Sequence, residues 1–272
     1  MPRLPPIPLK THLRNTPEIE IWPAAMLRAR GNATARLLAR ARRVLRRKRD
    51  GLYLAAELAD GLHPLVPGLH HEPGLPAARR ALALPPPPAG AAARHVGTLP
   101  LHRLHERLAT LGLDADGYAA RTGLPLVAEP DWLAFAGTDR WQRPLWLHID
   151  AARAWLHLRA AALADGIVLE AISGYRSHDY QLGIFERKQA RGLDVDAILA
   201  VNAAPGFSEH HAGLALDIST PGEPPADDTF EHTPAFAWLR DHAGGYGFTM
   251  SYPRDNPHGI VYEPWHWRYA AC

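Results

Sequence analysis

Cysteine is nearly absent from this sequence, because Cys272 is the only one among 272 residues. A single thiol excludes a disulfide within the sequence and any zinc site built from several cysteines. Long apolar runs are also lacking, and none approaches the roughly 20 residues that a transmembrane helix needs. The basic run that ends at Asp50 is followed by a segment that Glu57 and Asp60 interrupt, so the sequence predicts no clear signal peptide.

Acidic residues are scarce in the first third of the chain. Residues 1–95 carry 16 Lys and Arg against 6 Asp and Glu, whereas the remaining residues carry 14 against 22. Residues 33–49 (ATARLLARARRVLRRKR) place Leu37, Leu38 and Val44 on one helical face, with arginines on the others. The pattern predicts a basic helix that docks on the acidic body, in preference to a membrane-surface or nucleic-acid helix.

The proline-rich stretch at residues 84–90 predicts an extended linker, with a domain boundary near residues 91–95. We therefore expect a basic, Pro/Ala/Arg-rich extension over residues 1–95, poorly ordered in part, and a compact domain over residues 96–272. No recognisable motif lies in the extension. We accordingly expect a chain that begins near Gly97 to fold and to retain its chemistry.

The second part alternates helical and strand patterns. Helices are predicted around residues 101–111, 150–165, 179–190, 194–200 and 236–247, the second with Asp150 as N-cap and with Gly166 at its end. Strands are predicted at residues 167–172, 213–218, 248–252 and 265–269. Several strand pairs lack a crossover helix, which favours an α+β fold with a small antiparallel sheet over a doubly wound fold.

Polar residues with no evident packing role gather in SGYRS (173–177), SEHHAGLALD (208–217) and EPWHW (263–267). Catalytic zinc takes three nitrogen or oxygen ligands, and His210, Asp217 and His266 supply that number and type. The first two can converge if His210 lies in a turn that Gly213 permits. Singly, each residue has an ordinary structural explanation, such as a hydrogen-bonded histidine or a capping aspartate. Together they predict a metal site.

These motifs, with Gln181 after SGYRS and with YGFTMSYP and YEPWHWRY near the end, resemble the zinc D-alanyl-D-alanine carboxypeptidases of the VanY type, in the group with the hedgehog-type metallopeptidase (D,D-peptidase) fold. The resemblance covers about residues 147–269. It leaves residues 1–95 unexplained.

The resemblance implies a role for each matching residue. One zinc ion per chain would be held by His210, Asp217 and His266, with Glu263 as catalytic base. Arg176 would stabilise the oxyanion and hold the substrate, and it is also a candidate partner for the substrate's terminal carboxylate. Gln181 and Ser208 match substrate-contacting positions. His211 stands where glutamine is commoner, at a variable position.

The implied activity is zinc-dependent hydrolysis of the terminal D-alanine peptide bond of peptidoglycan stem peptides or their fragments. An L,D-carboxypeptidase and a D-Ala-D-Ala dipeptidase of the same fold remain open, and a non-catalytic cell-wall-binding module is less favoured. We expect a monomer in the cell envelope or periplasm, although a cytoplasmic location stays open without a clear signal peptide.

Two other classes are disfavoured. A serine D,D-peptidase needs S-x-x-K, and no serine here has lysine at that spacing; G-x-S-x-G is missing as well. Nucleic-acid binding by the basic extension is not expected as the main activity because the rest of the chain is acidic.

Overall fold

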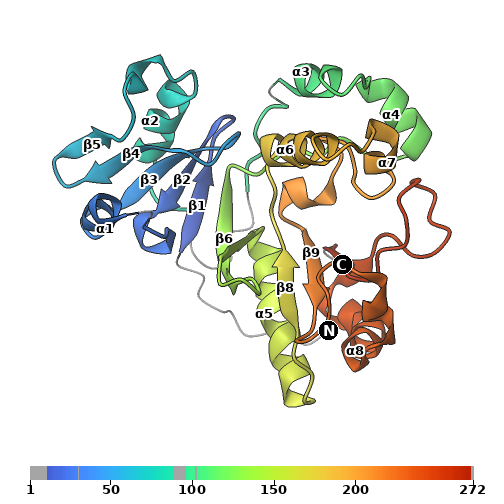
Figure 1. Cartoon of the computed structure of the whole chain (residues 1–272). Helices are drawn as coiled ribbons and strands as arrows, with labels where there is room; N and C mark the ends of the chain where they lie inside the picture. The colour runs from blue at the N-terminus through green and yellow to red at the C-terminus, as the bar shows by residue number, and fades with distance from the viewer. Residues whose placement is uncertain (1–10, 30, 88–95, 102, 271–272) are drawn as a thin grey trace.

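The computed structural model describes residues 11–29, 31–87, 96–101 and 103–270, which form two antiparallel sheets and the helices around them (Figure 1). The larger sheet has the strand order β5-β4-β3-β2-β1-β6-β7, and the smaller has the order β10-β11-β9-β8. The α+β fold with a small antiparallel sheet is therefore confirmed. The larger sheet was not expected.

Five strands of the larger sheet come from the extension, and two follow it. They are β1 (His12–Asn15), β2 (Ile19–Pro23), β3 (Arg43–Arg47), β4 (Tyr53–Leu58), β5 (Gly61–Pro64), β6 (Trp132–Thr138) and β7 (Pro144–Leu147). The extension also contains the short helices α1 (Asn32–Leu38) and α2 (Leu75–Ala83). The prediction that residues 1–95 are poorly ordered is wrong for residues 11–87, whereas residues 88–95, with the proposed boundary, lie outside the described part of the chain.

The basic helix predicted over residues 33–49 is also wrong, because helix α1 ends at Leu38 and residues 43–47 form strand β3. Val44 and Leu45 are fully buried in the sheet. The β3 arginines pair across strands: Arg43 with Glu57 at 2.6 Å and Arg46 with Glu20 at 2.7 Å. Sheet pairing and these distant carboxylates outweigh the helical pattern of the isolated segment.

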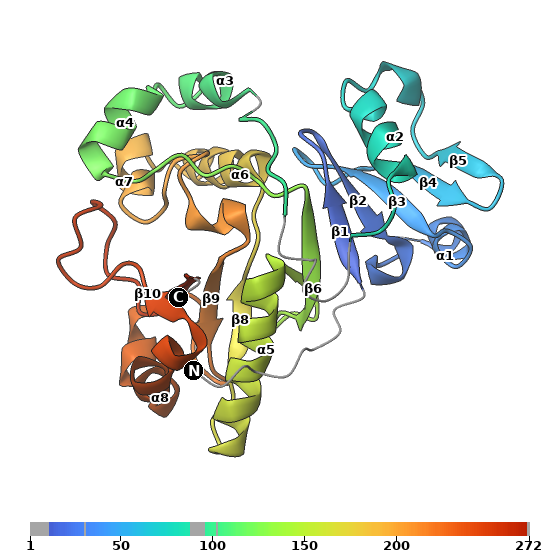
Figure 2. The same ribbon diagram turned by 180° about the vertical axis from the view of Figure 1, so that it is seen from behind.

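The extension is joined to the rest of the chain by sheet pairing. Strand β1 runs antiparallel to β6, with Leu13 opposite Leu133, and both of these leucines are fully buried. Figures 1 and 2 show the extension as a lobe beside the remainder of the molecule, with β1 next to β6. One continuous sheet therefore spans the two parts.

Most elements in the rest of the chain follow the predicted order, although helix α4 (Ala115–Thr122) and the strands β6 and β7 were not predicted. The helices of this part are α3 (Leu104–Ala109), α4 (Ala115–Thr122), α5 (Ile149–Ala164), α6 (His178–Gln189), α7 (Val195–Leu199) and α8 (Pro234–His242). The smaller sheet consists of β8 (Glu170–Ser173), β9 (Ala215–Ser219), β10 (Phe248–Met250) and β11 (His266–Tyr269). The N-cap of α5 is His148 rather than the predicted Asp150, because the His148 ring accepts from the Asp150 backbone N–H at 3.3 Å.

Two apolar clusters surround the smaller sheet. One joins helix α5, through Trp155 and Leu158, to the inner residues Leu216 and Trp267 of the sheet. The other joins α3, α4, α6 and α7 around Phe207. The same sheet also buries two polar side chains, those of Asp217 in β9 and His266 in β11. Among the described residues, no helix combines the length and apolarity needed to cross a bilayer.

Candidate metal and catalytic site

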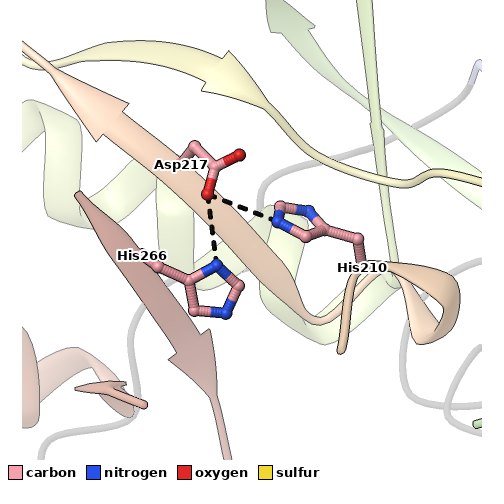
Figure 3. Close-up of side chains that lie close together, drawn as sticks. All are labelled: His210, Asp217 and His266. Atoms are coloured by element: carbon pink, nitrogen blue, oxygen red, sulfur yellow. Dashed lines mark hydrogen bonds and ion pairs between the residues drawn. The ribbon is translucent and has the colours of Figure 1, made fainter. Parts of the chain in front are cut away.

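Strand pairing brings the predicted metal ligands together. In the antiparallel β9–β11 pair, His266 lies directly opposite Asp217, and their Nδ1 and Oδ1 atoms are 3.1 Å apart. His210 belongs to the short 3-10 helix η4 (Glu209–Ala212) just before β9, and its Nε2 lies 3.3 Å from Asp217 Oδ1. Figure 3 shows the three side chains pointing toward one another, and one donor atom from each lies within 4.8 Å of the others.

The predicted turn at Gly213 accounts for this convergence. Gly213 ends η4 with φ of +66°, in the left-handed region that favours glycine. A Cβ at this position would lie 2.6 Å from Leu133 Cδ2 and 2.8 Å from the His148 backbone nitrogen. The turn reverses the chain tightly enough for His210 and Asp217 to face the same point.

Hydrogen bonds to their other ring nitrogens orient both histidines. His210 Nδ1 lies 2.7 Å from the Gly174 carbonyl, so it carries the proton and Nε2 keeps its lone pair for the cluster. His266 Nε2 lies 2.9 Å from Glu209 Oε2, which leaves Nδ1 facing Asp217. A carboxylate or carbonyl behind each ligating imidazole is the usual arrangement at metal sites. Sequence analysis missed Glu209, although its place beside His210 was the available signal.

The two histidines of the cluster differ in how strongly they hold a proton. Burial, together with the nearby charge of Arg176, lowers the pKa of His210 to about 4 despite the opposing effect of Asp217, so this ring is neutral near pH 7. Burial opposes protonation of His266, but hydrogen bonds to Asp217 and Glu209 outweigh it and raise the pKa of His266 to about 10. A metal ion bound at this point would displace the proton from His266, because a histidine must be deprotonated at the nitrogen that binds a metal.

Arg176 supplies a direct test of whether these residues fit a cation. Its Nη2 donates to His210 Nε2 and to Asp217 Oδ2, at 2.6 Å each, while its Nε donates to Ser173 Oγ at 2.9 Å. A positively charged nitrogen thus contacts two of the three candidate ligands. The donor set of two imidazoles and one carboxylate fits a divalent zinc-type ion.

Glu263 lies beside this cluster, where the resemblance placed the catalytic base. Its Oε2 is 3.9 Å from His266 Nδ1, and its backbone N–H donates to the Tyr252 carbonyl at 3.0 Å. Burial outweighs the opposing effect of the nearby His266 and raises the pKa of Glu263 to about 7. A carboxyl group with a pKa near neutrality can both take and return a proton.

A cavity of about 260 Å³ opens onto the cluster. Every predicted site residue lines it: Arg176, Gln181, Ser208, His210, Asp217, Glu263 and His266. Gln181 Nε2 donates to the Ala203 carbonyl at 2.8 Å, while its buried Oε1 has no hydrogen-bond partner among the described residues. That oxygen can accept a hydrogen bond from a ligand.

Two further cavity residues were not identified from the sequence. Lys188 lines the cavity from the last turn of α6, and burial lowers its pKa, against the attraction of Glu263. Tyr252 is buried, with its ring centroid 4.8 Å from that of His266. Lys188 lies outside every motif quoted above, whereas Tyr252 belongs to YGFTMSYP, to which the sequence analysis assigned no site residue.

His211 does not belong to the metal cluster. It is fully buried, its Nδ1 donates to the Arg176 carbonyl at 2.7 Å, and its Nε2 accepts from the Gly206 backbone N–H at 3.0 Å. The second histidine of the adjacent pair therefore fixes the backbone around the site.

Two histidines and one aspartate are buried together, and a glutamate lies beside them at the end of a cavity. This arrangement is typical of the active sites of metal-dependent hydrolases. The family model described as D-alanyl-D-alanine carboxypeptidase (VanY) matches residues 144–272. This chain belongs to the VanY family.

Individual relatives each match slightly less than half of the chain. YodJ of Bacillus subtilis (strain 168), provisionally named a carboxypeptidase, is 40% identical over 126 residues, which are 45% of this chain and 45% of YodJ. The bifunctional D-Ala-D-Ala dipeptidase and D-Ala-D-Ala carboxypeptidase VanXYC of Enterococcus gallinarum is 33% identical over 134 residues, 47% of this chain and 68% of that protein.

A solved structure also resembles this chain. It is a mutant of the vancomycin resistance D,D-pentapeptidase VanY, from the VanB-type resistance cassette, in complex with Zn(II). The sequence identity is 30%, the TM-score is 0.40, and the match covers 47% of this chain and 74% of the other. This chain spans less than half the length of YodJ, and the family model begins at residue 144, after the extension.

Proposed function

We propose that this protein is a zinc-dependent D,D-carboxypeptidase that removes the terminal D-alanine from peptidoglycan stem peptides or their fragments. The observation that carries the proposal is the convergence of His210, Asp217 and His266 with Glu263 at one end of a cavity. Membership of the VanY family supports the reaction type. Such a substrate places the activity in the cell envelope.

The three ligands would hold one zinc ion per chain, and a bound zinc ion supplies Lewis acidity toward a carbonyl and lowers the pKa of water. Glu263 serves as the base that takes a proton from the attacking water and returns it to the leaving amine. Its raised pKa, about 7, matches a group that must do both near neutral pH.

Arg176 and Lys188 divide the negative charges of the substrate between them. Arg176 contacts the ligand cluster directly, so it is placed to stabilise charge that develops on the scissile carbonyl oxygen. Lys188 lines the same cavity and can receive the terminal carboxylate. Gln181 and Ser208 add hydrogen-bonding groups that orient the terminal residue.

Two variants separate the role of base from the role of ligand. Glu263→Ala should keep stoichiometric zinc and lose about 10²- to 10⁴-fold in turnover, the usual contribution of a general acid–base group. His210→Ala should lose the metal itself. Zinc analysis and stem-peptide hydrolysis followed by mass spectrometry measure both effects, and equal metal loss in the two variants would reverse the assignment.

The same assay, run on pentapeptide, tetrapeptide and dipeptide substrates, distinguishes the proposed activity from the two related ones. Release of D-alanine from the pentapeptide alone supports the D,D-carboxypeptidase. Preference for the tetrapeptide indicates an L,D-carboxypeptidase, and cleavage of free D-Ala-D-Ala indicates a dipeptidase. Bound zinc without hydrolysis of any substrate would favour a wall-binding module.

A further inference from the structure

The extension buries a cation inside the catalytic half of the molecule. Lys48 directly follows strand β3, its side chain is fully buried, and its Nζ lies 2.5 Å from Glu129 Oε2. Glu129 belongs to the segment before β6, and its side chain is only 5% exposed. Buried lysines are rare and require a partner, so this pair links two segments at considerable desolvation cost.

The same carboxylate fixes the backbone on both sides of Arg176. Tyr175 Oη donates to Glu129 Oε2 at 2.5 Å, and the His178 backbone N–H donates to Glu129 Oε1 at 2.9 Å. His178 is the first residue of helix α6, so the carboxylate also lies at the positive end of that helix. Asn15 of β1 donates from Nδ2 both to Glu129 Oε2 at 3.2 Å and to Tyr175 Oη at 2.8 Å.

Lys48 supplies the positive charge that keeps this carboxylate ionised. Burial alone would raise the pKa of Glu129, but the charge of Lys48, followed by that of His178, holds it well below its ordinary range. Burial lowers the pKa of His178, so the adjacent Nζ of Lys48 is the main counter-charge of this carboxylate. Without Lys48, only the imidazole of His178, with its Nδ1 3.7 Å from Glu129 Oε1, would oppose this buried charge, and poorly compensated groups of this kind take up a proton or admit water.

Arg176 is coupled rigidly to this network. Its backbone N–H donates to the His210 carbonyl at 3.2 Å, and its carbonyl accepts from His211. A shift of Tyr175 or His178 would therefore move the Arg176 guanidinium relative to the ligand cluster. We propose that Lys48 of the extension is a positioning residue for Arg176, acting through Glu129 and Tyr175.

The first test replaces Lys48 by methionine in the full-length chain, with Arg43→Met as control. Arg43 begins the strand that Lys48 follows, and it pairs with Glu57 of β4 in a partly exposed ion pair. We expect Lys48→Met to keep zinc and to lose roughly 10- to 100-fold in kcat, since small misplacements of catalytic groups have effects of this size. KM should change little, and Arg43→Met should stay within about twofold of the parent.

A double-mutant cycle separates positioning from general destabilisation. In an Arg176→Ala background, Lys48→Met should lower kcat by less than about threefold, because the residue through which it acts is gone. An undiminished loss in that background would overturn the proposal. Kinetics are compared at a temperature well below the melting point of every variant.

A milder variant keeps the proposal testable if Lys48→Met does not fold. Tyr175→Phe retains the ring and the Lys48–Glu129 pair, and removes only the hydroxyl that contacts the carboxylate. We expect about a fivefold loss of kcat from one hydrogen bond. Parental kcat in this variant would overturn the proposal.

Hydrogen exchange gives a readout that does not depend on turnover. The His178 amide donates to Glu129, so the peptide covering residues 173–181 should exchange faster in Lys48→Met and at the parental rate in Arg43→Met. Equal exchange in all three proteins would contradict the proposal. The kinetic arm rests on the proposed function, whose own failure is distinct: the parental chain would then release no D-alanine.

Discussion

The two sheets carry their charged side chains in opposite ways. In the extension, arginines of β3 meet carboxylates across the strands, and the Arg43–Glu57 pair keeps 30% and 21% of its side chains exposed. In the smaller sheet, Asp217 and His266 lie opposite each other with 7% and 4% exposed. Exposed pairs of the first kind contribute little to stability, whereas buried groups of the second kind demand a counter-charge.

This difference in burial indicates which region of the molecule is able to bind a ligand. Cross-strand pairs on the extension satisfy one another and leave little for a ligand to gain. The buried cluster is satisfied only by a proton, by the guanidinium of Arg176 or by a metal ion, so it is chemically reactive. Lys48 is the place where the two kinds of region meet, since a cation of the extension neutralises a buried carboxylate near the site.

Removing the extension should have the largest effect, because it separates the two regions under comparison. A chain that begins at Gly97 loses β1, which exposes the pairing edge of β6, and it loses Lys48, which leaves Glu129 unpaired. We expect a loss of at least about 3 kcal/mol in the free energy of unfolding, or aggregation, because breaking a buried ion pair has a cost of this size. These contacts argue against the expectation that the extension is dispensable.

Denaturant unfolding of the truncated and full-length chains measures the effect. A truncated chain with parental stability and turnover would show that the shared sheet and the buried pair contribute little. Restoring residues 11–87 as a separate polypeptide provides the control, since recovery of turnover would identify the lost contacts as the cause.

The carboxylate behind His266 should matter for metal affinity. Replacing Glu209 by glutamine weakens the hydrogen bond that orients His266, and variants of such outer partners typically lose 10- to 100-fold in metal affinity. Arg268→Ala is the matched control, because Arg268 is 46% exposed and lies 3.5 Å from the other oxygen of Glu209. Competition with a zinc chelator compares the two, and similar affinities would remove Glu209 from the ligand system.

The turn before β9 offers a conformational test. Gly213→Ala and Gly166→Ala both place an alanine at a positive φ, +66° and +77° respectively, at a cost of about 1–2 kcal/mol. Only Gly213 has crowded neighbours, since nothing lies within 4 Å of a Cβ at Gly166. We expect Gly213→Ala to cost at least about 1 kcal/mol more in thermal unfolding and to weaken zinc binding. Equal destabilisation would mean that the turn adapts.

The smallest expected effect is a change in acid sensitivity. The pKa of Glu129 is depressed in the folded protein, so its stabilising contribution is present above about pH 4.5 and is lost as the pH falls from there toward the folded pKa. In that window the unfolded chain binds the extra proton. The Glu129→Gln variant lacks this carboxyl group. As the pH falls, its free energy of unfolding should therefore decrease less than that of the parent, by about 1.4 kcal/mol per pH unit. Identical slopes in urea unfolding between pH 4.5 and 3 would contradict the assignment.

Local sequence patterns predict the candidate site residues and much of the fold around them. His210, Asp217, Glu263 and His266 are recognisable because glycine, proline and alternating apolar residues within a few positions dictate how each side chain turns. The face of helix α5, with Trp155 and Leu158 buried, was predictable for the same reason. Local patterns of this kind survive without knowledge of distant partners.

The strands of the extension and their place in the larger sheet become apparent in the tertiary structure alone. Residues 43–47 form a strand because β2 and β4 pair with them on either side and acidic residues of neighbouring segments neutralise their arginines. Lys48 and Glu129 meet across 81 residues of sequence, and nothing near either one indicates the other. Contacts between distant segments depend on the register of the whole sheet, and this information is spread over strands too short and too basic to be recognised singly.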